Sequence, residues 1–325
     1  MNKGTRHGLV HLLLIGAISI SASSSLFIVQ ASKEPETWED MLIAQLAKRI
    51  GKEYKILPSL NFDERKYKDS VTKECIGDVQ CPTILLLHYT ALEEEEAEEK
   101  LIDIATLNPA STHYLVNRKG NITRFVAEDK RAWHAGLGAW DGETDVNTVS
   151  IGIETINLGC RRKFYPAGAC VDGSTQEWEP YDEALLKTLA ELCKDIIKRY
   201  NINPRHVIGH SDMATTKKGH LGRKVDPGPL FPWERFHKEH GIGAWYNLSS
   251  PLSKVKLPSK EDQVVWVQNH LREYGYTTCP QTGKLDIGTT RAVKMFQMHF
   301  RPTNISGEID EETIQILAQL VDKYC

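Results

Sequence analysis

Two histidines and one aspartate have the residue types and the spacing of a metal site. His210 ends a short β-branched run, and Asp226 follows in the same segment, immediately before Pro227. A third candidate, His88, ends the apolar run 84–87. Zinc prefers imidazole nitrogen and carboxylate oxygen, and catalytic zinc sites use three protein ligands and keep a fourth position for water. The sequence therefore predicts a catalytic Zn²⁺ site formed by His88, His210 and Asp226.

These three residues must be brought together by the strands of one sheet. Open α/β sheets place their chemistry at the ends of strands, and His88 and His210 each follow a short apolar run. The acidic run 93–99 is typical of the solvated face of a helix. Residues 61–80 are expected to be irregular. We expect an α/β domain with a mixed central sheet covered by helices. The expected strands are 84–87, 114–116, 122–126, 149–154 and 207–210, and the expected helices are 37–50, 93–107 and 182–200.

Seven segments between about residues 59 and 235 resemble the zinc-dependent N-acetylmuramoyl-L-alanine amidases of the amidase-2 type, and in particular their AmiD-like members. Each segment alone is a weak signal, but the seven occur in the order of the family. The resemblance implies the fold that these amidases share with peptidoglycan-recognition proteins. It also implies hydrolysis of the amide between the lactyl group of N-acetylmuramic acid and L-alanine. The segments are NFDER, LLLHYTA, STHYLVNRKGNITRFV, AWHAG, NTVSIGIE, VIGHSD and RKVDPGPLFPW.

The resemblance implies catalytic roles for two further residues. Glu154 ends the strand 149–154 and is expected to take a proton from water and pass it to the departing amine. Lys224 lies two positions before Asp226, so both side chains point to the same side if this segment is extended. Its charge is expected to stabilise the tetrahedral intermediate. His134, in AWHAG, and Asn147 are expected to bind substrate.

Each of these residues also has a structural interpretation. The two histidines of the metal site could be buried hydrogen-bonding residues, Glu154 could form a structural ion pair, and Lys224 could be an ordinary surface lysine. Asn147 could stabilise its own loop instead of contacting substrate. His220, between the two later ligands, is an alternative ligand, although a loop position argues against it.

The N-terminus predicts a targeting segment. Basic residues precede the apolar run 9–20, and residues 29–31 supply the small side chains of a cleavage site. We expect a signal peptide, export to the cell envelope and a periplasmic protein, with membrane contact only if the leader stays uncleaved. The leader has no cysteine, so the lipid attachment of AmiD-like lipoproteins lacks its acceptor. The predicted domains are a signal peptide at 1–31, a catalytic domain at 32–248, a linker at 249–259 and a C-terminal domain at 260–325.

The C-terminal residues predict three short helices. Ser259, Asp286 and Asp310 are the expected N-cap residues, each before an apolar stripe of helical period. The segments GYTTCPQTGKLDIGTTRAVKMFQ and SGEIDEETIQIL resemble the three-helix peptidoglycan-binding domain. Such a domain would hold an enzyme on its polymer and raise the local substrate concentration. The alternative is a helical bundle that only extends the fold.

Seven cysteines in an exported chain favour disulfides. Cys193 lies on the apolar face of a predicted helix and is expected to be free. The remaining six allow 15 connectivities. Local pairing predicts Cys75 with Cys81, Cys160 with Cys170, and Cys279 with Cys325.

Composition and charge fit an ordinary soluble globular protein and do not decide its function. The 325 residues are 41% hydrophobic and 26% charged, with a formal net charge of −3, which gives no indication of a nucleic-acid partner. We expect a monomer that acts on peptidoglycan and muropeptides and takes part in cell wall degradation. A non-catalytic recognition module and a zinc peptidase acting within the stem peptide are the alternatives. A purely structural wall anchor is a third.

Overall fold

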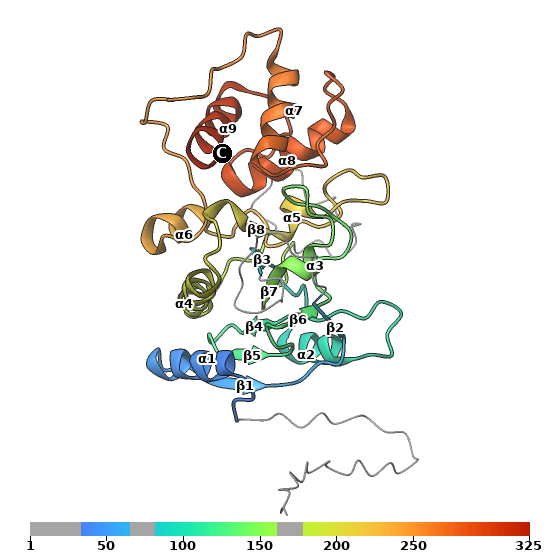
Figure 1. Cartoon of the computed structure of the whole chain (residues 1–325), viewed down its shortest axis with the longest axis vertical. Helices are drawn as coiled ribbons and strands as arrows, with labels where there is room; N and C mark the ends of the chain where they lie inside the picture. The colour runs from blue at the N-terminus through green and yellow to red at the C-terminus, as the bar shows by residue number, and fades with distance from the viewer. Residues whose placement is uncertain (1–33, 66–81, 161–177) are drawn as a thin grey trace, which may run out of the picture. The chain divides into compact units, whose positions relative to one another are not determined.

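A mixed sheet forms the centre of the chain (Figure 1). The structure is a computed structural model and describes residues 34–65, 82–160 and 178–325. The sheet has the strand order β1-β5-β4-β7-β3-β8, in which β4 and β5 are antiparallel and the other neighbours are parallel. This confirms the expected α/β class. The strands are β1 (Tyr54–Ile56), β3 (Ile84–Leu87), β4 (Tyr114–Val116), β5 (Ile122–Arg124), β7 (Ser150–Thr155) and β8 (Val207–Gly209).

A second, two-stranded sheet lies in a region that was expected to be irregular. Strand β2 (Phe62–Glu64) pairs antiparallel with β6 (Lys130–Ala132). The prediction for residues 61–65 was wrong because the partner strand lies far along the chain and three residues carry little periodicity of their own. The rest of the region predicted to be irregular, residues 66–80, lies outside the described residues.

Helices cover both faces of the sheet. Successive residues of a strand point to opposite faces, so β5 shows which helix lies on which side. Arg124 pairs with Asp40 on α1, whereas the neighbouring Thr123 donates a hydrogen bond to Glu98 on α2. Helix α4 packs against β3 and β4. The helices of this part are α1 (Trp38–Arg49), α2 (Glu94–Ile102), α3 (Val146–Val149), α4 (Glu183–Tyr200), α5 (His210–Met213) and α6 (Trp233–His240).

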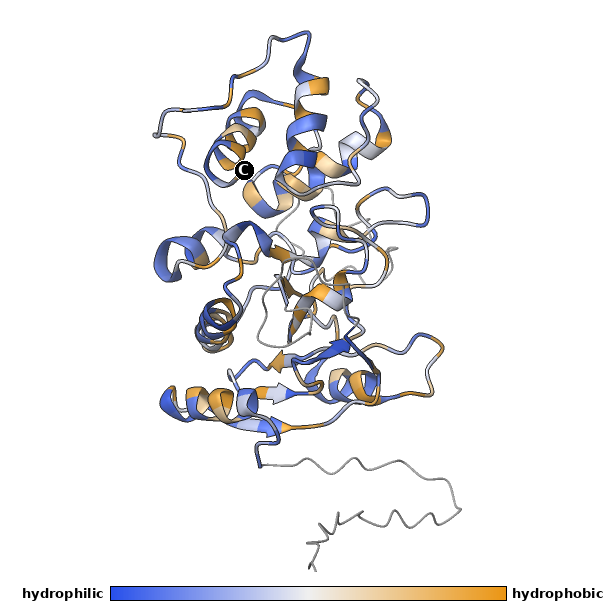
Figure 2. Cartoon of the chain, in the orientation of Figure 1, coloured by the Kyte–Doolittle hydropathy of each residue, from blue (hydrophilic) through white to orange (hydrophobic). Residues whose placement is uncertain are grey.

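Local sequence signals explain where helix α1 begins and why the helices bury one face. Thr37 and Asp40 form a capping box at the start of α1. Hydrophobic and hydrophilic residues follow one another along α1 and α9 (Figure 2), as expected for helices that bury one face. No helix among the described residues is long and apolar enough to cross a membrane.

The C-terminal part consists of α7 (Gln263–Tyr274), α8 (Ile287–Phe300) and α9 (Glu311–Tyr324). Asp286 and Asp310 cap α8 and α9 as expected, each accepting from a backbone N–H three residues later. Ser259 does not cap α7. The N-cap residue is Asp262, and the Ser259 hydroxyl instead donates to its carboxylate at 2.7 Å. The prediction failed because an extra turn separates the serine from the helix.

The cysteines correct one predicted pairing. Cys193 is free and buried, as expected. Cys279 and Cys325 are also free, so the predicted bond between them is wrong. Cys279 is buried in the C-terminal part, whereas Cys325 is exposed beyond α9 and lies close to the backbone of Glu273. The other two predicted bonds involve Cys75, Cys81 and Cys170, which lie outside the described residues.

Candidate active site

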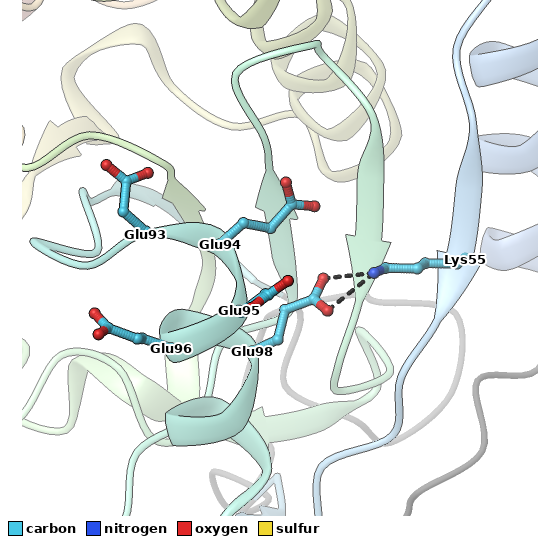
Figure 3. A pocket seen from close by; sticks show the side chains of 6 residues that line it. All are labelled: Lys55, Glu93, Glu94, Glu95, Glu96 and Glu98. Atoms are coloured by element: carbon cyan, nitrogen blue, oxygen red, sulfur yellow. Dashed lines mark hydrogen bonds and ion pairs between the residues drawn. The ribbon is translucent and has the colours of Figure 1, made fainter.

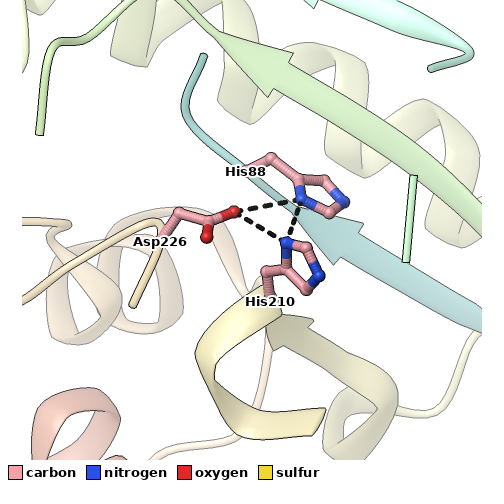
Figure 4. Close-up of side chains that lie close together, drawn as sticks. All are labelled: His88, His210 and Asp226. Carbon is pink, nitrogen blue, oxygen red and sulfur yellow. Dashed lines mark hydrogen bonds and ion pairs between the residues drawn. The ribbon is translucent and has the colours of Figure 1, made fainter. Parts of the chain in front are cut away.

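His88, His210 and Asp226 converge at one end of the sheet (Figure 4). The Nδ1 atoms of the two histidines are 3.0 Å apart. The Oδ2 atom of Asp226 lies 3.1 Å from Nδ1 of His88 and 3.0 Å from Nδ1 of His210. All three side chains are buried. Three residues from distant parts of the sequence thus form the group of potential metal ligands that the sequence predicted.

The ends of β3 and β8 place the two histidines side by side. The two strands are parallel neighbours, with Leu87 opposite Gly209, and each histidine is the next residue. Gly209 also lets the aspartate approach, because a Cβ atom there would come within 2.5 Å of the Pro227 ring. The backbone carbonyl of Asp226 accepts a hydrogen bond from the N–H of Ser211.

Hydrogen bonds behind His210 fix the proton on its ring. Its Nε2 lies 2.8 Å from the backbone carbonyl of Ala135, which can only accept. Nε2 therefore carries the proton, and Nδ1 of the neutral ring presents a lone pair to the other two ligands. The N–H of Ala135 donates to the side-chain oxygen of Asn147, which holds this carbonyl in place.

A second chain of hydrogen bonds fixes the proton on His88. The Ser150 hydroxyl donates to the carbonyl of Val146 at 2.6 Å, so it can only accept from Nε2 of His134 at 3.2 Å. Nδ1 of His134 is then an acceptor, and it lies 3.0 Å from Nε2 of His88. His88 must donate from Nε2 and present the lone pair of Nδ1. Burial, which lowers the pKa of His88 to about 4 and that of His134 well below its usual value, keeps both rings neutral.

The site therefore fits a cation. Two imidazole lone pairs and one carboxylate oxygen lie within 3.1 Å of one another, and such acceptors repel unless a positive charge lies between them. Ligands about 2.0 to 2.1 Å from a tetrahedral zinc ion lie roughly 3.3 Å apart, close to the distances found here.

A small cavity of about 110 Å³ opens beside these ligands. Glu154 and Lys224, the two predicted catalytic residues, both line it, together with His134, His210 and Asp226. Glu154 lies on β7, and its Oε2 atom is buried without a hydrogen-bond partner. Burial raises the pKa of Glu154 to about 8.

Helix α2 closes one side of this cavity. Ala97, Lys100 and Leu101 of α2 contribute to its wall, and the exposed side chain of Lys224 lies at the same cavity. The arrangement brings a carboxyl group and an ammonium group to one small space beside the three ligands.

The two predicted substrate-binding residues have structural partners. His134 lines the cavity but also forms the chain between Ser150 and His88, and Gly152 leaves room for its ring, since a Cβ there would come within 2.6 Å. The Asn147 side chain accepts from the N–H groups of His134 and Ala135 and is not among the residues that line the cavity. Contact with substrate stays a prediction for both.

Sequence reasoning missed the residues that support the ligands. Ser150 was not singled out, although it lies in the NTVSIGIE segment between two residues that were. Arg65 was also missed: it is buried and donates to the backbone carbonyls of Thr148 and Ser150 at 2.5 and 2.9 Å. Only its charge within the NFDER segment hinted at a role. His220, the alternative ligand, is not part of the group of potential ligands among the described residues.

The acidic start of α2 forms a larger hollow, of about 550 Å³, on the surface (Figure 3). Its acidic side chains are mostly exposed, and Glu98 pairs with Lys55 at 2.7 Å. This agrees with the expected solvated helix face. The side chains that line it are Lys55, Glu93, Glu94, Glu95, Glu96 and Glu98.

The fold and the site define a hydrolase with a metal-ligand group at the end of a mixed α/β sheet, and comparisons with known proteins agree. A family model described as N-acetylmuramoyl-L-alanine amidase matches residues 78–229, and one described as a putative peptidoglycan binding domain matches residues 260–317. N-acetylmuramoyl-L-alanine amidase AmiD from Escherichia coli (strain K12) is 36% identical over 250 residues, which cover 74% of this chain and 83% of AmiD. The chain belongs to the N-acetylmuramoyl-L-alanine amidase family.

Solved structures give the same result. The complex of AmiD from E. coli with anhydro-N-acetylmuramic acid-L-Ala-D-gamma-Glu-L-Lys is similar with a TM-score of 0.60 and 33% identity, covering 81% of this chain and 98% of that one. The structure of AMPDH3 from Pseudomonas aeruginosa in complex with anhydromuramic pentapeptide has a TM-score of 0.61 and 34% identity, covering 82% and 99%. Amidases of this family are zinc-dependent in general.

Proposed function

We propose that this protein hydrolyses the amide bond between the lactyl group of N-acetylmuramic acid and the L-alanine of the peptidoglycan stem peptide, and that Zn²⁺ held by His88, His210 and Asp226 is its cofactor. One observation carries the proposal. Three acceptor atoms within 3.1 Å of one another adjoin a cavity that also contains the unpartnered carboxylate oxygen of Glu154.

The residues of the cavity divide the chemistry between them. Zinc at such ligands lowers the pKa of a bound water to about 7 and polarises a carbonyl group. Glu154 takes the proton of the attacking water at its free Oε2 and returns it to the departing amine of L-alanine. Burial raises the pKa of this carboxyl group from its ordinary value toward neutral pH, where one carboxyl group can both accept and donate a proton.

Lys224, His134 and Asn147 have the remaining roles in the proposed reaction. Lys224 lines the cavity, and we assign to its ammonium group the stabilisation of the oxyanion that forms on the scissile carbonyl. His134 and Asn147 hold the rings of the ligands in the required orientation. Loss of one oxyanion donor typically slows turnover by about 10² to 10³.

We propose the substrate from the two matched domains, and the location from the predicted leader and the cysteine content. The solved relatives hold anhydromuramic peptides, so we propose that muropeptides of this type, along with intact peptidoglycan, are substrates. The residues matched by the peptidoglycan-binding family would bind the polymer. The predicted leader and the cysteine content support export to the periplasm, where this substrate lies.

The masses of the products test the proposed reaction. Purified anhydro-N-acetylmuramyl tripeptide is incubated with the protein, with and without a chelator. An amidase yields the sugar free of peptide and an intact tripeptide, and the chelator stops the reaction. A peptidase would leave alanine on the lactyl group, and a recognition module would leave the substrate whole. Either of these results contradicts the proposal.

A further inference from the structure

One buried carboxylate joins the C-terminal helices to the helix that carries a metal ligand. Asp212 is fully buried. Its Oδ1 accepts from the hydroxyl of Tyr276 at 2.6 Å, and its Oδ2 accepts from Nδ1 of His299 at 2.8 Å. Tyr276 follows α7, and His299 lies near the end of α8, so both donors belong to the C-terminal part.

The same carboxylate closes the turn that presents His210. Helix α5 has only four residues, His210 to Met213, with Gly209 as its N-cap. The Oδ2 atom of Asp212 accepts the N–H of Gly209 at 2.8 Å, which is one half of a capping box. A four-residue helix has little stability of its own, so the position of its first residue depends on these side-chain contacts.

Asp212 needs the C-terminal donors. A buried carboxylate is costly unless hydrogen bonds replace its lost hydration. Of the three donors to Asp212, only the N–H of Gly209 comes from the catalytic part. Without Tyr276 and His299, Oδ1 would lose its only hydrogen-bond donor among the described residues, and Oδ2 would lose one of its two donors.

Aromatic packing holds these donors in place. The ring of His299 stacks on Trp233 at 3.9 Å between centroids, and Tyr276 packs edge-on against Trp140 at 5.0 Å. Gly275 permits this approach, because a Cβ atom there would come within 2.6 Å of the Trp140 ring. The two tryptophans belong to the catalytic part and are buried.

We infer that the C-terminal part does more than bind polymer: Tyr276 and His299 are positioning residues that hold His210 in place through Asp212. This inference rests on the proposed function, because His210 is taken as a zinc ligand. A part that served only as a wall anchor would affect insoluble substrate alone. A part that positions a ligand also affects zinc affinity and the turnover of small soluble muropeptides, which need no anchor.

The test uses full-length variants that remove one donor at a time. Tyr276→Phe removes only the hydroxyl, and His299→Phe keeps a ring on Trp233 but removes the Nδ1 donor. His299→Asn restores a donor near the Nδ1 position. Tyr324→Phe is the matched control, because it removes a hydroxyl that bonds to the backbone of Trp245 away from the site.

The experiment has two readouts. The first is zinc affinity, measured by competition with a chelator, and the second is kcat and KM on soluble anhydromuropeptide. Loss of a residue that orients a metal ligand typically lowers metal affinity by about 10- to 100-fold. We expect losses toward this range for Tyr276→Phe and His299→Phe, a fall in kcat larger than any change in KM, and recovery in His299→Asn. Binding to purified sacculi should stay unchanged.

Three results would overturn the inference. The first is a zinc affinity and a turnover of soluble substrate that stay within about twofold of wild type in both Tyr276→Phe and His299→Phe. The second is an equal loss of zinc affinity in Tyr324→Phe. The third is a zinc affinity in His299→Asn that is no higher than in His299→Phe. If His299→Phe does not fold, Tyr276→Phe alone decides, since it keeps the ring. A wild-type protein that binds zinc but cleaves no muropeptide would contradict the proposed function, while the affinity series would still test the inference.

Discussion

At the scale of single residues, the position of each proton determines what the site can bind. The carbonyl of Ala135 and the hydroxyl of Ser150 direct the lone pairs of His210 and His88 toward Asp226. The sequence predicted the three ligands because each lies in a distinctive segment. It did not reveal Ser150, because a serine at the start of a strand has no pattern that distinguishes it from its neighbours.

The carboxyl group of Glu154 should make the metal-free protein less stable as the pH rises. Its folded pKa is about 8, whereas an unfolded glutamate has a pKa of about 4.3. Between these values the folded state keeps a proton that the unfolded state has released, so the free energy of unfolding falls with increasing pH. Glu154→Gln has no such proton. We expect the variant to be more stable than wild type near pH 8 and similar to it near pH 4.

Urea unfolding in the presence of a chelator measures this difference. The three ligands are present in both proteins, so their titration largely cancels in the comparison. A variant that is no more stable than wild type at the higher pH would show that Glu154 ionises in the folded protein at an ordinary pH.

At the scale of elements, residues 61–65 and 146–150 show where prediction from the sequence ends. The long helices α1 and α4 and the buried strands β3 and β8 follow from apolar periodicity and capping residues. The short elements β2, α3 and α5 do not: β2 lacks the apolar run that marks β3 and β8, and the four-residue helices α3 and α5 contain barely one helical period. Tertiary hydrogen bonds stabilise them, and Arg65 supplies several of these.

Replacement of Arg65 should therefore destabilise the protein and weaken the metal site. Burial lowers the pKa of Arg65 to about 10. Its guanidinium donates to the carbonyls of Glu128, Thr148 and Ser150. Arg65→Met keeps much of the apolar volume but leaves these carbonyls unpaired, at a cost of about 1 to 3 kcal/mol for each that stays dry. We expect a lower free energy of unfolding in urea and weaker zinc binding.

Arg118→Met is the control for this comparison. Arg118 pairs with Glu93, Glu179 and Asp182 at the surface, where ion pairs contribute little. Equal losses in the two variants would contradict the role assigned to Arg65.

At the scale of the whole molecule, the sequence predicted two parts joined by a linker, and the described residues show how closely they are joined. One core cluster contains residues of α4 as well as residues of α7, α8 and α9. Residues 253–255 of the predicted linker donate backbone N–H groups to Asp322 of α9. The sequence could not show this, because interfacial aromatic residues such as Trp140 and Tyr276 have the same pattern as ordinary core residues.

One zinc ion per chain and one cleaved amide bond define the proposed activity, and a single titration tests both. The protein is freed of metal with a chelator, zinc is added stepwise, and the release of intact tripeptide from anhydro-N-acetylmuramyl tripeptide is followed. We predict that hydrolysis rises with bound zinc up to one ion per chain, and that Asp226→Ala shows no such rise. Hydrolysis that persists without zinc, or that is equal in Asp226→Ala, would contradict the account.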